Sequence, residues 1–181
     1  MDKKIEKIFN LYEKFGQKDY IGENVSQIEH MTQSAMLAEK DGYSKDIILG
    51  CFFHDIGHLL EHSKDMDGFG VMNHEKLGSK FIKDLGFPEI TYLIIENHVS
   101  AKRYLCWKDS NYLKNLSSAS KKTLEYQGGV MSEEEAKKYE DNKNYKLFLK
   151  IRKYDELSKV IGQKINNLEY YKNMCREVLN N

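Results

Sequence analysis

Residues 45–58 read KDIILGCFFHDIGH and join a strongly apolar segment to a cluster of ionisable side chains. The segment from Ile47 to Phe53 is apolar on nearly every side of a helix, which predicts a helix buried all round. His54 and Asp55 follow directly at its end. An aspartate buried beside a histidine is costly unless a positive charge compensates it. A divalent cation supplies that charge, so this stretch predicts a metal site in the core.

The sequence on both sides of this stretch also has helical periodicity. Apolar residues recur at three- and four-residue steps over 5–15, and the capping-box spacing of Ser26 and Glu29 predicts a helix that ends at Gly42. No alternating strand pattern is present, so we expect one all-α domain over residues 1–181. Further helices are expected from Asn73 to Gly86, over 88–105, from Ser132, over 144–159 and from about residue 166, with a polar, partly irregular stretch over 107–129.

Composition excludes several classes of protein. The chain has 181 residues, 28 basic and 28 acidic side chains, a length that suits one domain and a balance that argues against a dedicated nucleic-acid binder. No apolar run approaches the roughly 18–20 residues that span a bilayer, and the first residues lack the apolar stretch of a signal peptide. We therefore expect a cytoplasmic protein with no membrane, nucleic-acid or obligate protein partner.

The cysteines do not form a recognisable framework. Cys51, Cys106 and Cys175 are odd in number and far apart, which excludes a disulfide scaffold or a paired-cysteine zinc site. We expect buried or idle thiols instead.

The string HDIGH at 54–58, with isolated histidines around it and an aspartate far downstream, resembles the pattern H…HD…H…H…D of the HD-domain superfamily of helical metalloproteins. A lone histidine is more often a surface or core residue than a ligand, but six residues in this order favour a metal centre. The resemblance implies one helical bundle with two metal ions in its core and Asp55 bridging them. The residues that match the pattern are His30, His54, Asp55, His74, His98 and Asp155.

The type of ligand narrows the choice of metal. Imidazoles and carboxylates without a thiolate suit iron, manganese or zinc better than copper(I) or a structural zinc site. Two carboxylates do not neutralise two such ions, so the site stays positive and attracts an anionic substrate. His62 matches no motif and is expected to be solvated.

A closer resemblance covers residues 19–157. The stretch DYIGENVSQIEH is similar to a loop of the mixed-valent di-iron oxygenases within this superfamily. Four further segments resemble the oxygenases of this family that act on (R)-2-amino-1-hydroxyethylphosphonate: NHEKLGSKFIKDLGF, HVSAKRYL, YLKNLSSASKKTLEYQGG and KIRKYDE. The resemblance implies two iron ions, an Fe(II)/Fe(III) pair, with O2 as co-substrate. The implied reaction cleaves the carbon–phosphorus bond and yields glycine and phosphate.

The resemblance also implies roles for two residues of the first segment. Tyr20 would be a removable metal ligand that leaves when substrate binds, and Glu23 would pair with the ammonium group of the substrate. From the residues alone, Tyr20 is an ordinary loop tyrosine. Glu23 read in the same way is an acidic residue that stabilises the start of a helix.

Two cations accompany the predicted ligands. Lys102 follows His98 by four residues, so the two side chains project from one helical face. Arg152 precedes Asp155 by three residues, with the same consequence. Two cations beside a metal site suit a phosphonate dianion through charge-assisted hydrogen bonds.

Neutral donors complete the predicted anion pocket. Ser118, Ser120 and Thr123 offer hydroxyl groups, although residues of this type also serve as plain helix caps. His58 follows His54 by four residues and shares its face if the helix continues.

Other functions remain open from the sequence. HD-domain proteins more commonly hydrolyse phosphate esters or nucleotides with a metal-bound hydroxide, and the same six ligands would serve. Tyr20 favours the oxygenase, because a hydrolase gains nothing from a ligand that blocks its open position. A metal-stabilised regulatory domain fits less well, since an open cationic site exceeds structural need. A trimethylammonium substrate also remains open, because aromatic faces bind such groups and tyrosines are plentiful.

Overall fold

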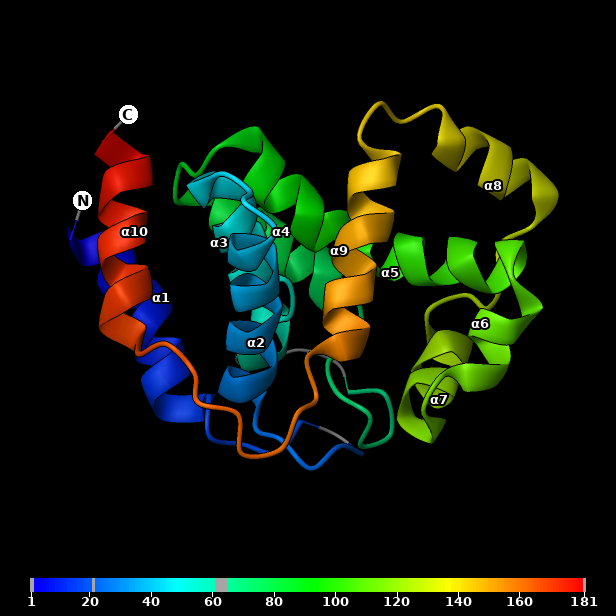
Figure 1. The fold of residues 1–181 in the computed structure, drawn as a ribbon, viewed down its shortest axis with the longest axis horizontal. Coiled ribbons are helices and arrows are strands. Elements are labelled where there is room, and N and C mark those ends of the chain that lie inside the picture. Colours follow the sequence, from blue (N-terminus) through cyan, green and yellow to red (C-terminus); the bar gives the residue numbers. More distant parts are fainter. Residues whose placement is uncertain (1, 21, 61–64, 181) are drawn as a thin grey trace.

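The apolar helix that precedes His54 lies in the interior of the fold. In the computed structural model, α3 (Lys45–Phe53) packs between α2 (Gln27–Lys40) and α5 (Glu89–Lys108), and its residues from Ile48 to Phe53 are buried. Figure 1 shows α2 and α3 side by side at the centre. The structure describes residues 2–20, 22–60 and 65–180, so His62 lies outside the described residues.

The other regular elements of the described chain are also helices, as predicted. Within the described ranges there is no β-strand, and no helix there is long and apolar enough to cross a membrane. The remaining elements are α1 (Asp2–Phe15), the 3-10 helix η1 (Ile56–Leu59), α4 (His74–Asp84), α6 (Ser110–Asn115), α7 (Ser118–Tyr126), α8 (Glu133–Glu140), α9 (Tyr145–Leu157) and α10 (Leu168–Asn180).

Local capping explains where several helices begin. The capping box expected at the start of α2 is present, because the Ser26 hydroxyl accepts from the Glu29 N–H while the Glu29 carboxylate accepts from the Ser26 N–H. The segment 107–129 is more regular than predicted. Asp109 and Ser117 each accept a hydrogen bond from a backbone N–H in the first turn of the next helix, and these caps start α6 and α7.

The two terminal helices pack against each other, and α10 also packs against α3. Figure 1 shows α1 and α10 next to each other, with both termini at that end. The rings of Tyr12 and Tyr171 both stack on Phe52, at centroid distances of 4.7 and 4.0 Å, and the Tyr12 hydroxyl donates to the Phe52 carbonyl. The terminal helices therefore support the segment that leads into His54.

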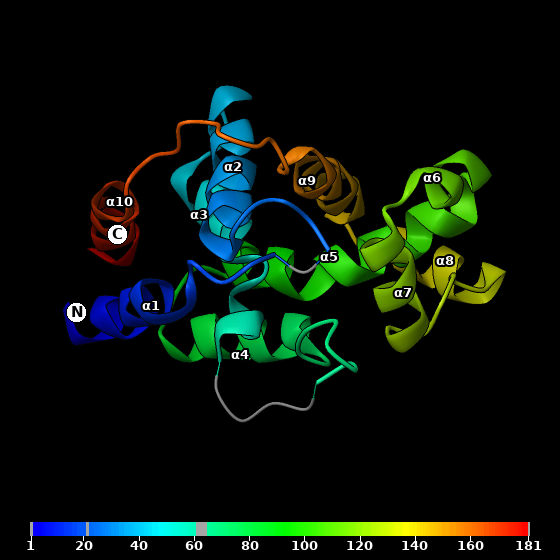
Figure 2. The same cartoon turned by 90° about the horizontal axis from the view of Figure 1, so that it is seen from below.

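The last turn of α9 lies near the end of α3, although the two helices are far apart in the sequence. Figure 2 shows α9 between α2 and the group formed by α6, α7 and α8, with α5 running beneath both. Because α9 packs against both α2 and α5, its inward side chains face the end of α3. The candidate site lies there.

Candidate metal centre

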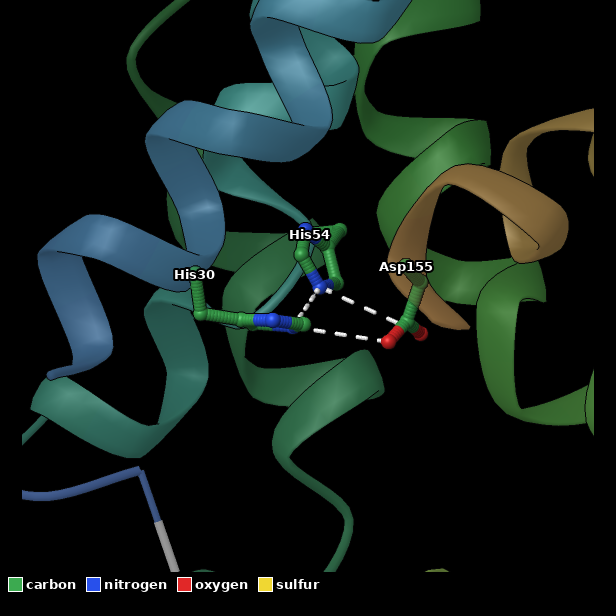
Figure 3. A group of neighbouring side chains, drawn as sticks. All are labelled: His30, His54 and Asp155. Atoms are coloured by element: carbon green, nitrogen blue, oxygen red, sulfur yellow. Dashed lines mark hydrogen bonds and ion pairs between the residues drawn. The ribbon is translucent and has the colours of Figure 1, made fainter. Parts of the chain in front are cut away.

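His30, His54 and Asp155 meet at the point where three helices converge (Figure 3). His30 lies on α2, His54 follows α3 directly and Asp155 lies on α9, and all three are buried. The two histidine Nε2 atoms are 3.0 Å apart, and His30 Nε2 lies 3.4 Å from Asp155 Oδ1. These atoms surround one point, as ligands of a single ion do.

Asp55 stands between this group and a second pair of histidines. Its Oδ2 lies 3.6 Å from His30 Nε2 and 3.5 Å from His54 Nε2, while its Oδ1 lies 3.4 Å from His74 Nε2 and 3.2 Å from His98 Nε2. The Nε2 atoms of His74 and His98 are 2.9 Å apart. One carboxylate thus faces two sets of imidazoles, the arrangement of a ligand that bridges two ions.

The four histidines share one hydrogen-bonding arrangement. In each, Nδ1 lies 2.7–3.1 Å from a backbone carbonyl oxygen. A carbonyl oxygen only accepts, so Nδ1 carries a proton in each histidine and Nε2 is the nitrogen that faces the centre, where it can bind a metal ion once it has lost any proton of its own. The pairs are His30 with Ser158, His54 with Cys51, His74 with Val71 and His98 with Ile95.

The electrostatics of the centre favour added positive charge. Burial alone raises the pKa of both Asp55 and Asp155, but the positive charge of the neighbouring His54 and Arg152 respectively holds both pKa values well below the usual range. Burial opposes charge on His54, yet the two aspartates raise its pKa to about 9. Asp155 Oδ1 is buried without a hydrogen-bond donor among the described residues. This donor set fits two borderline divalent ions such as iron, manganese or zinc.

Helix α3 does not continue as far as His58, so the condition for His58 to share a helical face with His54 is not met. Helix α3 ends at Phe53 and the chain turns into η1, where a Cβ at Gly57 would lie 2.0 Å from the His74 carbonyl oxygen. Only glycine permits this approach, which turns His58 toward α4. Its ring stacks on His74 at 3.9 Å, and its Nδ1 accepts from the Val71 N–H.

His58 is therefore a neutral donor beside the second histidine pair. Burial and the adjacent His74 hold its pKa well below the usual range, and with Nδ1 accepting, the proton lies on Nε2. His58, Asp55 and His74 also lie close enough to hold an ion together. Because its Nε2 carries the proton, His58 is a donor at this position rather than a third ligand, and the candidate ligands there remain His74, His98 and Asp55.

A small cavity of about 50 Å³ adjoins the centre. It has room for a few water molecules or a compact polar ligand. Apart from the ligands, it brings together most of the residues expected to contact substrate. These are Tyr20, Glu23, His58, Lys102, Ser120, Thr123 and Arg152. Ser118 is exposed and does not line the cavity, because it begins α7 on the outer side.

Lys102 is a buried cation without a carboxylate partner among the described residues. Its Nζ donates to the Thr123 hydroxyl at 3.0 Å, and burial together with the nearby Arg152 lowers its pKa to about 7. Arg152 is compensated, since it pairs with Asp155 at 2.6 Å and with Glu156. Lys102 is therefore a buried amine whose charged form lacks a carboxylate partner, so an anion bound in the cavity would favour that charged form.

Tyr20 and Glu23 cover the cavity from the loop before α2. The Tyr20 ring stacks on His30, with centroids 3.8 Å apart. Burial and the neighbouring Asp55 raise its pKa well above the usual range, so the phenol is protonated here. The Glu23 carboxylate pairs with Lys159 at 2.7 Å.

Among the residues that sequence reasoning missed, three have polar groups placed at the site. Gln27 and Gln127 line the cavity, and each has a buried side-chain oxygen without a donor among the described residues. Ser158 orients His30 through its backbone carbonyl. Gln27 could have been found, because it is a polar residue one turn before His30. The contact of Ser158 is made by its backbone carbonyl, so the pattern of side chains gives no sign of it.

Comparison with known proteins agrees with this geometry. The HD domain family model matches residues 27–151, which include every histidine of the centre. A protein of Acanthamoeba polyphaga mimivirus, named only as uncharacterized, is 47% identical over 97% of this chain and 81% of its own length.

Two further relatives are named as enzymes. The [1-hydroxy-2-(trimethylamino)ethyl]phosphonate dioxygenase (glycine-betaine-forming) of Leisingera caerulea is 37% identical over 86% of this chain and 80% of its own. The hydroxymethylphosphonate dioxygenase of Gimesia maris is 33% identical over 93% of this chain and 84% of its own.

Proposed function

This chain belongs to the HD-domain family, and from that membership we propose that it is an oxygenase that cleaves the carbon–phosphorus bond of a small 1-hydroxyphosphonate. The proposed substrate is (R)-2-amino-1-hydroxyethylphosphonate, with glycine and phosphate as products and two iron ions, as an Fe(II)/Fe(III) pair, as cofactors. The names of two relatives support the substrate class. Their substrates differ in the group attached to the hydroxyl-bearing carbon. The names of the relatives therefore support the class of substrate, and the choice of the aminomethyl group is our own proposal.

One observation carries the proposal. Asp55, which faces both histidine pairs, and Lys102, whose ammonium has no carboxylate partner among the described residues, line the same small cavity. A ligand held there has its anionic end on the cation and its other end at the metal centre. Positioning of this kind removes orientational freedom before reaction.

The residues of the chain have separate tasks in this proposal. Bound iron supplies the electron-transfer and O2 chemistry. Lys102 and Thr123 bind the phosphonate oxygens through charge-assisted and neutral hydrogen bonds. The Nε2–H of His58 donates to a substrate oxygen, and Glu23 accepts from the ammonium group. Tyr20 covers the ion held by His30 until substrate enters.

The three buried cysteines bear on where the reaction takes place. Cys51, Cys106 and Cys175 are all free. Free thiols are the rule in reducing compartments, and on this basis we place the reaction in the cytoplasm.

Oxygen consumption tests the proposal directly. Iron-loaded protein with (R)-2-amino-1-hydroxyethylphosphonate is expected to consume O2 and release phosphate and glycine in matched amounts. The variant Lys102→Met should lose this activity, whereas Lys122→Met, which alters an exposed lysine paired with Glu125 on α7, should retain it.

The leading alternative is a metal-dependent phosphohydrolase, and the same assay separates it. Phosphate released from a phosphate ester or nucleotide, without O2 loss and with zinc or magnesium under anaerobic conditions, would overturn the oxygenase proposal. Turnover of the trimethylammonium or hydroxymethyl analogue alone would retain the activity and replace the substrate.

A further inference from the structure

An ammonium group already lies against the carboxylate that faces the cavity. Lys159 Nζ is 2.7 Å from Glu23 Oε1, and both side chains are 17% exposed. The same Nζ lies 5.8 Å from the centre of the Tyr20 ring, within the range of a cation–π contact. Glu23 and Tyr20 therefore form an ammonium site, and a residue of the chain itself fills it.

The backbone on both sides of Lys159 is fixed to α2. The Ser158 carbonyl accepts from His30 Nδ1 at 2.9 Å. The Val160 N–H donates to the Gln33 side-chain oxygen at 3.0 Å, and the Val160 carbonyl accepts from the Gln33 amide at 2.9 Å. The long lysine side chain is thus free to leave Glu23 while the backbone and the metal ligands stay in place.

No other ion pair among the described residues involves Glu23. When Lys159 leaves, the carboxylate, which is only 17% exposed, has no compensating charge. An incoming ammonium group can then replace Lys159 at little electrostatic cost, whereas a ligand without one leaves the pair intact.

We infer that Lys159 is an internal competitor for the ammonium site and sets the preference between phosphonates that carry an ammonium group and phosphonates that do not. The inference rests on the proposed function, because it requires a phosphonate in the cavity beside Glu23. A partly exposed ion pair has a modest free energy, so the competition should weaken binding of an ammonium-bearing phosphonate about five-fold. Lys159 is a positioning residue, since it acts through Glu23.

Kinetics with two substrates test the inference. The variant Lys159→Met keeps the length of the side chain and removes the charge. It should raise kcat/KM for 2-amino-1-hydroxyethylphosphonate about five-fold relative to hydroxymethylphosphonate. Lys164→Met, which alters an exposed lysine on the same segment, should leave the ratio unchanged. In a Glu23→Gln background Lys159→Met should have no effect on the ratio, because the competition acts through that carboxylate.

Binding without turnover separates this inference from the proposed function. The ligands are 2-aminoethylphosphonate and ethylphosphonate, measured by calorimetry on anaerobic iron-loaded protein. Lys159→Met should tighten only the first, about five-fold. If Lys159→Met tightens only 2-aminoethylphosphonate and the protein oxidises no hydroxyphosphonate, the role of Lys159 as a competitor is supported and the proposed oxygenase function is refuted. Equal effects on both ligands, or none on either, in a variant with an unchanged melting temperature would overturn the inference.

Discussion

The ring of Tyr20 lies nearly parallel to the ring of His30, with centroids 3.8 Å apart and planes inclined by 12°. The loop that covers the cavity thus rests directly on a candidate metal ligand. The same loop carries Glu23, which pairs with Lys159. A substrate that displaces this loop would therefore disturb both the ion pair and the contact with His30.

Tyr20→Phe is expected to keep the stacking and remove only the phenolic oxygen. The melting temperature should then change little, while ferric protein without substrate should lose the visible absorption expected of an iron-bound phenolate. The raised pKa of Tyr20 keeps the phenol protonated without metal, and a bound cation reverses this. Absorption spectra of the two iron-loaded proteins check the prediction, and identical spectra would contradict it.

Asp55→Asn should reduce the iron content from two ions per chain to one or none. The amide removes the negative charge between the two histidine pairs and leaves one oxygen in place of two. Asp84→Asn, at an exposed carboxylate paired with Lys80, is the matched control and should retain both ions. Metal analysis after gel filtration measures this, and two ions in the Asp55 variant would rule out the bridging role.

Lys102 makes the stability of the metal-free protein depend on pH. Its pKa is about 7 in the folded protein and roughly 10.4 in the unfolded chain. Between pH 7 and roughly pH 10.4 the unfolded chain therefore binds more protons than the folded protein, so the free energy of unfolding rises with pH over this range. The cost of the buried charge is greatest below pH 7. Lys102→Met should therefore raise the melting temperature by about 3–6 °C at pH 6 and by less at pH 9. Thermal unfolding at both pH values checks this, and a larger gain at pH 9 would contradict the assignment.

Gly57→Ala should damage both the fold and the metal centre. The new methyl group would lie 2.0 Å from the His74 carbonyl oxygen, so η1 must move away from α4 and carry Asp55 with it. We expect a loss of about 3 kcal/mol in the free energy of unfolding. Gly68→Ala, where nothing lies within 4 Å and only a positive φ is strained, should cost about 1 kcal/mol. Urea unfolding and iron analysis measure both effects, and similar losses would refute the steric argument.

The sequence was most informative where local chemistry decides the structure. The apolar run of α3 predicted a buried helix, and the Ser26–Glu29 spacing predicted a cap that the structure contains. The all-α fold followed from such local signals. The histidines and aspartates that match the HD-domain pattern lie close together in the structure, and they were singled out by the resemblance to that family rather than by helix geometry.

Contacts between distant segments were not predictable. The end of α3 at Phe53 depends on how closely Gly57 approaches α4, and that is a property of the packed fold. The pairing of Glu23 with Lys159 joins two loops at opposite ends of the chain. Charge alone gave no reason to prefer this pair, because lysines and glutamates are abundant throughout the sequence.

The segment that follows α9 is hydrogen-bonded to α2, and this has a consequence for biosynthesis. His30 receives its orienting carbonyl from Ser158 and its carboxylate neighbour from Asp155, both of which leave the ribosome after all four histidines of the centre. Synthesis runs from the N-terminus and a domain folds as a unit, so the histidines emerge before the residues that complete the pocket around them. A metal ion can enter its completed environment only when synthesis is nearly finished, and a chain truncated before α9 would carry the imidazoles without the carboxylate and carbonyl that complete the group around His30.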